Sequence, residues 1–268
     1  MDYFLLVLNG FSAYQLAVAQ INNSDTQIYI DECIWSLRKA LLCKEGSQGD
    51  SRIYYVLGKA YYYKGASYAD LSVTYLEAAR RGGYEAQDIP EYLGLAYASV
   101  HDYRNSVAAF SLALDAGAES GAELVPAADS SNPLEIISTR NTSYTEGELP
   151  SDLLLLSIAR SYTALDEYDA ARAYLVRCLE ISKDSNTRVA TRLLLGEILA
   201  KAGNSSAAES QYLTILEENG DYADAHYQLG ELYAAEGDKY KARAELRRAL
   251  RVNPAHGPAQ TLLTRLNM

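Results

Sequence analysis

A short pattern that recurs along the chain limits its possible folds more than any other feature. An aliphatic residue is followed by a small residue, and a tyrosine or leucine comes three positions after the small one. The small residues stand 36, 65, 37 and 34 positions apart, at Gly58, Gly94, Ala159, Gly196 and Gly230. Repetition at this period is typical of one supersecondary unit used in series, because no single unit can bury its apolar faces without its neighbours.

Each unit has the pattern of two helices joined by a short turn. In the last unit Ala242, Leu246 and Ala249 recur at intervals of four and three, which is the helical period and not the strand period of two. Gly237 lies at the predicted turn, where glycine tolerates the left-handed backbone that ends many helices. Pro254 follows the second helix, where a missing N–H costs little. The pattern therefore predicts an all-α chain built from helix pairs.

These residues resemble the tetratricopeptide repeat family. The signature of that family is W-x2-L-G-x2-Y, followed by A-x3-F and a proline, at a period of about 34 residues. Leu229, Gly230 and Tyr233 match its first part, with His226 in place of the tryptophan. The resemblance implies a right-handed α-solenoid of about six tandem two-helix repeats, with one long insertion.

The positions of the repeats divide the chain into five parts. Residues 1–50 are expected to form an N-terminal helix pair, as a degenerate repeat or cap, and two repeats follow in 51–116. An insertion occupies 117–150, three repeats occupy 151–256, and a capping helix occupies 257–268.

The insertion, whose surplus residues lie in 117–149, is rich in Ser, Asn and Gly and contains Pro126 and Pro133. This composition does not suit a helix pair. Long segments without secondary structure are functional or disordered in most proteins. Two interpretations stay open: a tolerated surface loop, or a flap or docking segment at the inner surface of the solenoid.

The segment at 3–21 raises the question of a membrane. It contains Asn9, Ser12 and Gln15, so it is not a clean apolar run of about 20 residues. A signal peptide has some support from its short apolar core, but the only charge before that core is Asp2. We expect a buried helix and a cytoplasmic protein. A membrane anchor, with association at the cell envelope, is the alternative.

The recurring small residues indicate close helix packing. Glycine inside a helix costs about 1 kcal/mol relative to alanine, so its recurrence at one position needs a compensating contact. We expect that contact to be with small residues of the second helix, namely Ala78, Ala113, Cys178 and Ala249. Larger rings are then expected to fill the space between successive units, at Tyr75, Phe110 and Tyr212.

The net charge of −11 argues against general nucleic-acid binding, which requires a basic surface. The densest basic run lies in 239–251 and is interpreted as a solvated helix face or as a contact for an acidic partner or anionic lipid. The 3 cysteines are too few for a disulfide scaffold.

The chain contains no motif that indicates catalysis. It has no phosphate-binding glycine loop, no dinucleotide fingerprint and no His, Cys or Asp cluster with the spacing of metal ligands. We therefore predict that the protein is not an enzyme and uses no cofactor or metal. An enzyme or small-molecule receptor that uses the groove and the insertion stays as an alternative.

The resemblance also predicts the binding surface, because in this family the first helix of each unit lines a concave groove for peptides or helices. The corresponding residues are Tyr55, Lys59, Tyr62, Tyr63, Glu91, Leu95, Arg160, Glu197, Lys201, Tyr227 and Glu231. Tyrosine and arginine are favoured at interface hot spots. One subset of the family holds C-terminal carboxylates with Lys and Asn on these helices, but here Lys59 stands without matching asparagines.

The predicted function is a non-catalytic scaffold or adaptor for a protein or peptide partner with apolar anchors and some basic residues. A membrane-tethered bacterial envelope assembly or cargo factor is the first alternative.

Overall fold

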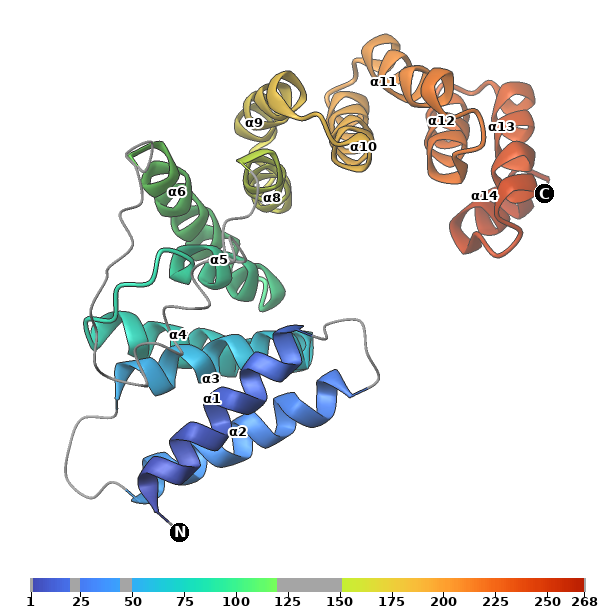
Figure 1. The fold of residues 1–268 in the computed structure, drawn as a ribbon. Helices are drawn as coiled ribbons and strands as arrows, with labels where there is room; N and C mark the ends of the chain where they lie inside the picture. The colour runs from blue at the N-terminus through green and yellow to red at the C-terminus, as the bar shows by residue number, and fades with distance from the viewer. Residues whose placement is uncertain (1, 20–24, 44–49, 120–150, 268) are drawn as a thin grey trace. The chain divides into compact units, whose positions relative to one another are not determined.

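A computed structural model describes residues 2–19, 25–43, 50–119 and 151–267 of the protein (Figure 1). Within these ranges the regular structure is α-helical, apart from the short 3-10 turn η1 (Ala66–Tyr68). The predicted all-α architecture is therefore confirmed. The insertion predicted at 117–150 lies outside the described residues, except for the end of one helix at 117–119.

Contacts group the chain into two compact units, residues 1–161 and residues 162–268. The first unit contains α1 (Tyr3–Ala19), α2 (Thr26–Cys43), α3 (Ser51–Lys64), α4 (Ala69–Arg81), α5 (Ile89–Ser99) and α6 (Tyr103–Glu119). Helix α8 (Ser151–Ala164) spans the boundary. The second unit contains α9 (Tyr168–Ile181), α10 (Ser185–Lys201), α11 (Ser205–Glu218), α12 (Ala223–Ala235), α13 (Lys239–Val252) and α14 (Gly257–Asn267).

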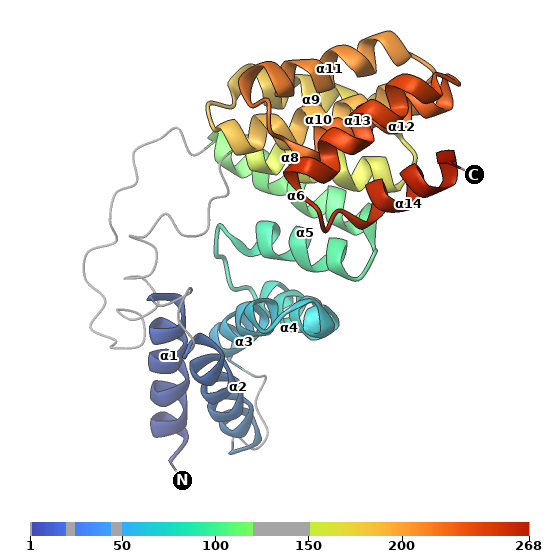
Figure 2. The same ribbon diagram turned by 90° about the vertical axis from the view of Figure 1, so that its right-hand side faces the viewer.

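Helices that are neighbours in sequence pack as pairs. In the first unit α1 lies against α2, α3 against α4, and α5 against α6. In the second unit α10 lies against α11 and α12 against α13, and the helix α14 covers α13 (Figure 2). Leu262 of α14 is buried together with Leu246 and Ala249 of α13.

Capping residues explain where several helices begin and end. The side chains of Asp50, Asp184 and Asp238 accept hydrogen bonds from backbone N–H groups in the first turns of α3, α10 and α13. These bonds satisfy donors that a helix leaves unpaired at its start. Gly203 and Gly237 have φ values of 78° and 86° in the turns after α10 and α12. Only glycine adopts this conformation without a steric cost.

The recurring glycines of α3, α5, α10 and α12 each lie against a large residue of the second helix of their pair. An added Cβ at Gly94 would stand 2.5 Å from Cδ1 of Phe110, and one at Gly58 would stand 2.5 Å from Cγ of Leu76. Tyr212 and Leu246 occupy the same position beside the glycines of α10 and α12. The prediction that small residues face small residues is therefore wrong. Glycine makes room for a large apolar side chain within its own helix pair.

In the α3–α4 pair, the buried residues of the second helix stand one position later than the repeat pattern predicts. Ser72, Leu76 and Ala79 are fully buried in α4, whereas Tyr75 is only partly buried. The extra residues in the turn before α4 form η1 and shift the repeat frame by one position. The ring of Tyr75 instead stacks on Tyr61, with centroids 5.5 Å apart.

The N-terminal helix pair follows the same packing rule. Gly10 of α1 is buried, and an added Cβ there would stand 2.5 Å from Cγ of Leu37 in α2. The sequence pattern missed this glycine because Asn9 precedes it in place of an aliphatic residue. Leu6, Phe11 and Tyr14 are also buried, as predicted for a packed helix. Within the described ranges, none of the helices is both long and apolar enough to cross a bilayer.

Candidate functional site

Four of the predicted groove residues lie on α3 at helical spacing. Lys59 follows Tyr55 by four residues, and Tyr62 and Tyr63 follow Lys59 by three and four residues. These intervals place the four side chains on neighbouring faces of one helix. The three tyrosines are half-buried and Lys59 is only 7% exposed. The burial of Lys59 requires a compensating partner, because an unpaired buried ammonium is costly.

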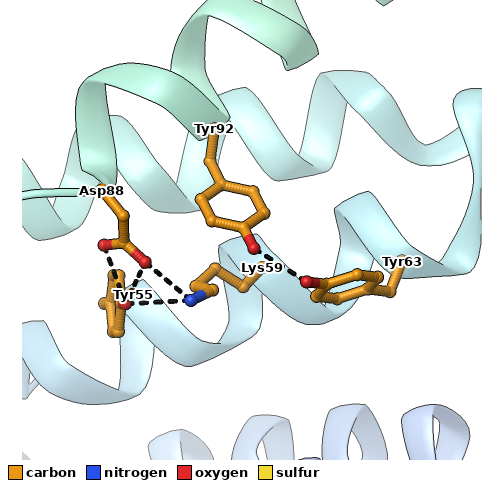
Figure 3. A network of polar contacts seen from close by, with 5 residues as sticks. All are labelled: Tyr55, Lys59, Tyr63, Asp88 and Tyr92. Atoms are coloured by element: carbon orange, nitrogen blue, oxygen red, sulfur yellow. Dashed lines mark hydrogen bonds and ion pairs between the residues drawn. The ribbon is translucent and has the colours of Figure 1, made fainter. Parts of the chain in front are cut away.

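Asp88, the residue directly before α5, is that partner. Its Oδ2 atom lies 2.7 Å from Nζ of Lys59, and both side chains are largely buried. The Tyr55 hydroxyl donates to the same carboxylate and accepts a 3.1 Å hydrogen bond from Lys59 (Figure 3). These three side chains therefore link α3 to the start of α5 and leave the lysine charge neutralised inside the protein.

Tyrosine rings surround the same ammonium group. Its Nζ atom lies 4.5 Å from the ring centroid of Tyr92, 5.1 Å from that of Tyr55 and 5.8 Å from that of Tyr14. A cation at such distances is attracted by the negative face of an aromatic ring. Helices α1, α3 and α5 thus each contribute one ring around Lys59.

A second contact joins α3 to α5 through phenol groups. The hydroxyls of Tyr63 and Tyr92 are 2.8 Å apart and share a hydrogen bond (Figure 3). The ring of Tyr62 packs edge-on against Tyr92, with centroids 5.2 Å apart, and against Tyr63 at 5.5 Å. We call Tyr55, Tyr62, Tyr63 and Tyr92 the tyrosine cluster.

Burial raises the pKa of three tyrosines of the cluster. Desolvation raises the pKa of Tyr55 and Tyr92 well above that of an ordinary phenol, and the charge of Asp88 raises both further. Desolvation also raises the pKa of Tyr62. Tyr55, Tyr62 and Tyr92 are therefore neutral near pH 7 and serve as hydrogen-bonding groups with large apolar rings. Among the described residues, no three His, Cys, Asp or Glu side chains lie together in a way that could hold a metal ion.

The other predicted residues of the first unit are Glu91, Leu95 and Arg160. Glu91 of α5 is buried at 5% exposure, and Leu95 one turn later is half-buried. Arg160 of α8 is exposed. Glu91 therefore offers little surface to a ligand, whereas Arg160 is accessible.

The predicted residues of the second unit form two small pairs. Glu197 and Lys201, one turn apart on α10, make an exposed ion pair of 2.8 Å. The Tyr227 hydroxyl of α12 is hydrogen-bonded to Glu231, and its ring lies 5.0 Å from that of His256. Burial raises the pKa of Tyr212, and the charges of Glu197 and Glu231 raise it further, so both pairs lie near this ring.

Sequence reasoning missed three residues of the site, Asp88, Tyr92 and Tyr14. Asp88 carried a usable signal, because the order Asp88, Ile89, Pro90 is typical of a helix start, and helix starts in a repeat protein lie beside the preceding first helix. Tyr92 and Tyr14 stand at no signature position of the repeat, and no sequence signal distinguishes them.

Comparison with known proteins gives two matches to family models, both described as tetratricopeptide repeat, at residues 154–185 and 223–256. The anaphase-promoting complex subunit CDC16 of Saccharomyces cerevisiae is 30% identical over 119 residues. That match covers 42% of this chain but only 14% of the length of CDC16.

Solved structures resemble the chain over most of its length. PilW, a type IV pilus biogenesis factor, gives a TM-score of 0.62 at 16% identity, over 95% of this chain and 98% of its own. YrrB, a TPR protein with an unusual peptide-binding site, gives 0.54 at 20% identity, over 84% and 96% of the two chains. PilF of Pseudomonas aeruginosa gives 0.57 at 13% identity, over 96% and 97%. At these identities the likeness concerns the fold alone.

Proposed function

We propose that this chain, which matches tetratricopeptide repeat models at residues 154–185 and 223–256, is a non-catalytic scaffold that binds a protein or peptide through the tyrosine cluster of α3 and α5. Scaffolds for protein interaction are the general role of this fold, but fold does not identify a partner. The proposal therefore depends on the local chemistry of the cluster.

One observation carries the proposal: three half-buried tyrosines gather at α3, with their neighbouring lysine already neutralised. Tyr55, Tyr62 and Tyr63 combine large apolar rings with hydroxyl groups. Such side chains bury much area for little loss of side-chain entropy, which is why tyrosine is enriched at hot spots. The Lys59 charge is held by Asp88 and so does not define the partner.

This arrangement favours a partner with apolar anchors over one with a free carboxylate. A carboxylate would have to compete with Asp88, whose Oδ2 atom is already 2.7 Å from Nζ of Lys59. An apolar side chain that packs on the rings needs no such exchange. Phenol hydroxyls can also accept hydrogen bonds from basic side chains of the partner. YrrB, of similar fold, is described as having a peptide-binding site, which supports a peptide as the occupant.

Within the first unit, Leu95 and Arg160 are proposed as further contacts. The predicted residues of the second unit are proposed as contacts of that unit by itself: Glu197, Lys201, Tyr227 and Glu231.

The test removes two phenols from α3 and compares the proteins captured with cross-linking from native lysate. Tyr62→Ala with Tyr63→Ala is expected to keep the helix content by circular dichroism and to lose the partners that the unaltered chain captures. Tyr54→Ala with Tyr75→Ala is the matched control, because these two rings contact each other at a centroid distance of 6.1 Å on the α3–α4 pair and lie outside the cluster. Equal capture by the Tyr62 and Tyr63 variant would show that the site is wrongly placed.

A further inference from the structure

Helix α13 carries a series of positively charged side chains, although the chain as a whole is acidic. Lys239, Arg243, Arg247 and Arg251 follow one another at intervals of four, although the whole chain has a net charge of −11. Like charges at this interval repel each other and weaken a helix. Cations in the first turn also oppose the helix dipole. Arg251 lies in the last turn, where a cation suits the helix dipole, but the other three positions do not stabilise α13 in this way.

Part of the positive charge on α13 is already satisfied. Lys241 pairs with Asp238 at 3.7 Å, Arg248 pairs with Glu245, and Arg243 donates to the backbone carbonyl of Leu266.

Arg247 and Arg251 differ from these side chains. Both are exposed, and neither has an acidic partner among the residues that the structure describes. Tyr240 lies on the same face, because it precedes them by seven and eleven residues, and its side chain is 87% exposed. An exposed tyrosine beside two unpaired arginines combines the residue types most common at interface hot spots.

The apolar face of α13 is used inside the protein. Ala242, Leu246 and Ala249 are completely buried, and Leu246 and Ala249 pack against Leu262 of α14. A helix that binds lipid inserts its apolar face into the membrane. The apolar face of α13 is not available for insertion into a membrane. The arginines on its exposed face therefore favour a protein as the partner over a lipid surface.

We propose that Tyr240, Arg247 and Arg251 form a docking surface for an acidic segment of a partner protein, separate from the tyrosine cluster and independent of its function. Arg247 and Arg251 are about 6 Å apart along the helix axis by the rise per residue. Alternate residues of an extended strand are about 6.6 Å apart, so an extended segment with acidic side chains at every second position matches both arginines. Each guanidinium can hold a carboxylate with two hydrogen bonds, and the exposed ring of Tyr240 covers the backbone of the segment.

The test uses a fluorescein-labelled peptide of ten residues in which Glu and Ser alternate, and follows binding by anisotropy at low salt. Arg247→Glu with Arg251→Glu is expected to weaken binding at least about tenfold, because both attractive contacts become repulsive. Arg172→Glu with Arg177→Glu is the matched control, since it changes the net charge equally at exposed positions of α9 in the same unit. The control is expected to stay within about twofold of the unaltered chain.

Tyr240→Ala is a second variant that leaves the charge unchanged and is expected to weaken binding by a smaller factor. Equal loss in the α9 control would show that bulk charge, and not this docking surface, attracts the peptide. Tighter binding of a ten-nucleotide single-stranded DNA, or of vesicles with phosphatidylserine, through the same two arginines would overturn the assignment to a protein partner. Circular dichroism of each variant confirms that helix content is preserved.

Discussion

Gly94→Ala tests the packing rule on which the whole fold depends. An added Cβ would stand 2.5 Å from Cδ1 and 2.6 Å from Cε1 of Phe110, about 1 Å closer than carbon atoms normally approach. The Phe110 ring is only 1% exposed, so it has little space to move. Overpacking of a core costs about 1–3 kcal/mol, and the helix propensity of alanine returns about 1 kcal/mol. We expect a net loss of up to about 2 kcal/mol in the free energy of unfolding.

Urea unfolding followed by circular dichroism measures this loss as a lower midpoint. Gly257→Ala is the control, because an added Cβ at this first residue of α14 meets no atom within 4 Å. That variant is expected to be as stable as the unaltered chain or slightly more so. Phe110→Leu, combined with Gly94→Ala, is expected to recover part of the loss by removing the ring. If Gly94→Ala were as stable as Gly257→Ala, close packing would not explain the recurring glycine.

Two further predictions concern the tyrosine cluster. Asp88→Asn leaves the Lys59 ammonium buried without a counter-charge and is expected to lower the free energy of unfolding in urea by about 3 kcal/mol. Lys59→Met combined with Asp88→Asn removes the buried charge and is expected to recover most of that stability. Equal stability of the single and double variants would contradict the role of this ion pair. Burial raises the pKa of Tyr55 and Tyr92, so the folded chain holds protons that the unfolded chain releases above the ordinary tyrosine pKa of 10.0. The stability they contribute is complete below pH 10.0 and is lost as the pH rises further, which thermal unfolding between pH 8 and pH 11 would detect as a falling midpoint.

The helix pairs could be predicted because their signals are local. Helical periodicity, turn glycines such as Gly237 and a small residue at a fixed interval act within a single unit, and each survives in the sequence as a spacing. The partner of each glycine was harder to predict. A helix buries one face, and residues three or four apart on that face satisfy the same period, so spacing alone does not say whether Ala113 or Phe110 faces Gly94. The added turn residues before α4 then shifted the register from Tyr75 to Leu76.

The candidate site was predictable on one helix and not between helices. Tyr55, Lys59, Tyr62 and Tyr63 share α3, so their spacing was enough to group them. The partners of Lys59 come from elsewhere in the chain, and a contact across 29 residues to Asp88 leaves no period to detect. Sequence reasoning could therefore group these α3 residues but could not show that the charge of Lys59 is already neutralised by Asp88.

The two surfaces that we propose for binding differ in whether their cationic side chains have a counter-ion. At the tyrosine cluster a buried cation has found its counter-ion, so Lys59 and Asp88 fix the rings of α3 and α5 in place and leave an aromatic surface. On α13, Arg247 and Arg251 have no counter-ion among the described residues. Their mutual repulsion, four residues apart, destabilises the helix. The first arrangement suits a partner held by apolar burial, and the second suits a partner that supplies the missing negative charge. A single class of ligand does not satisfy both, so the physical chemistry of the chain favours a scaffold with two different kinds of contact.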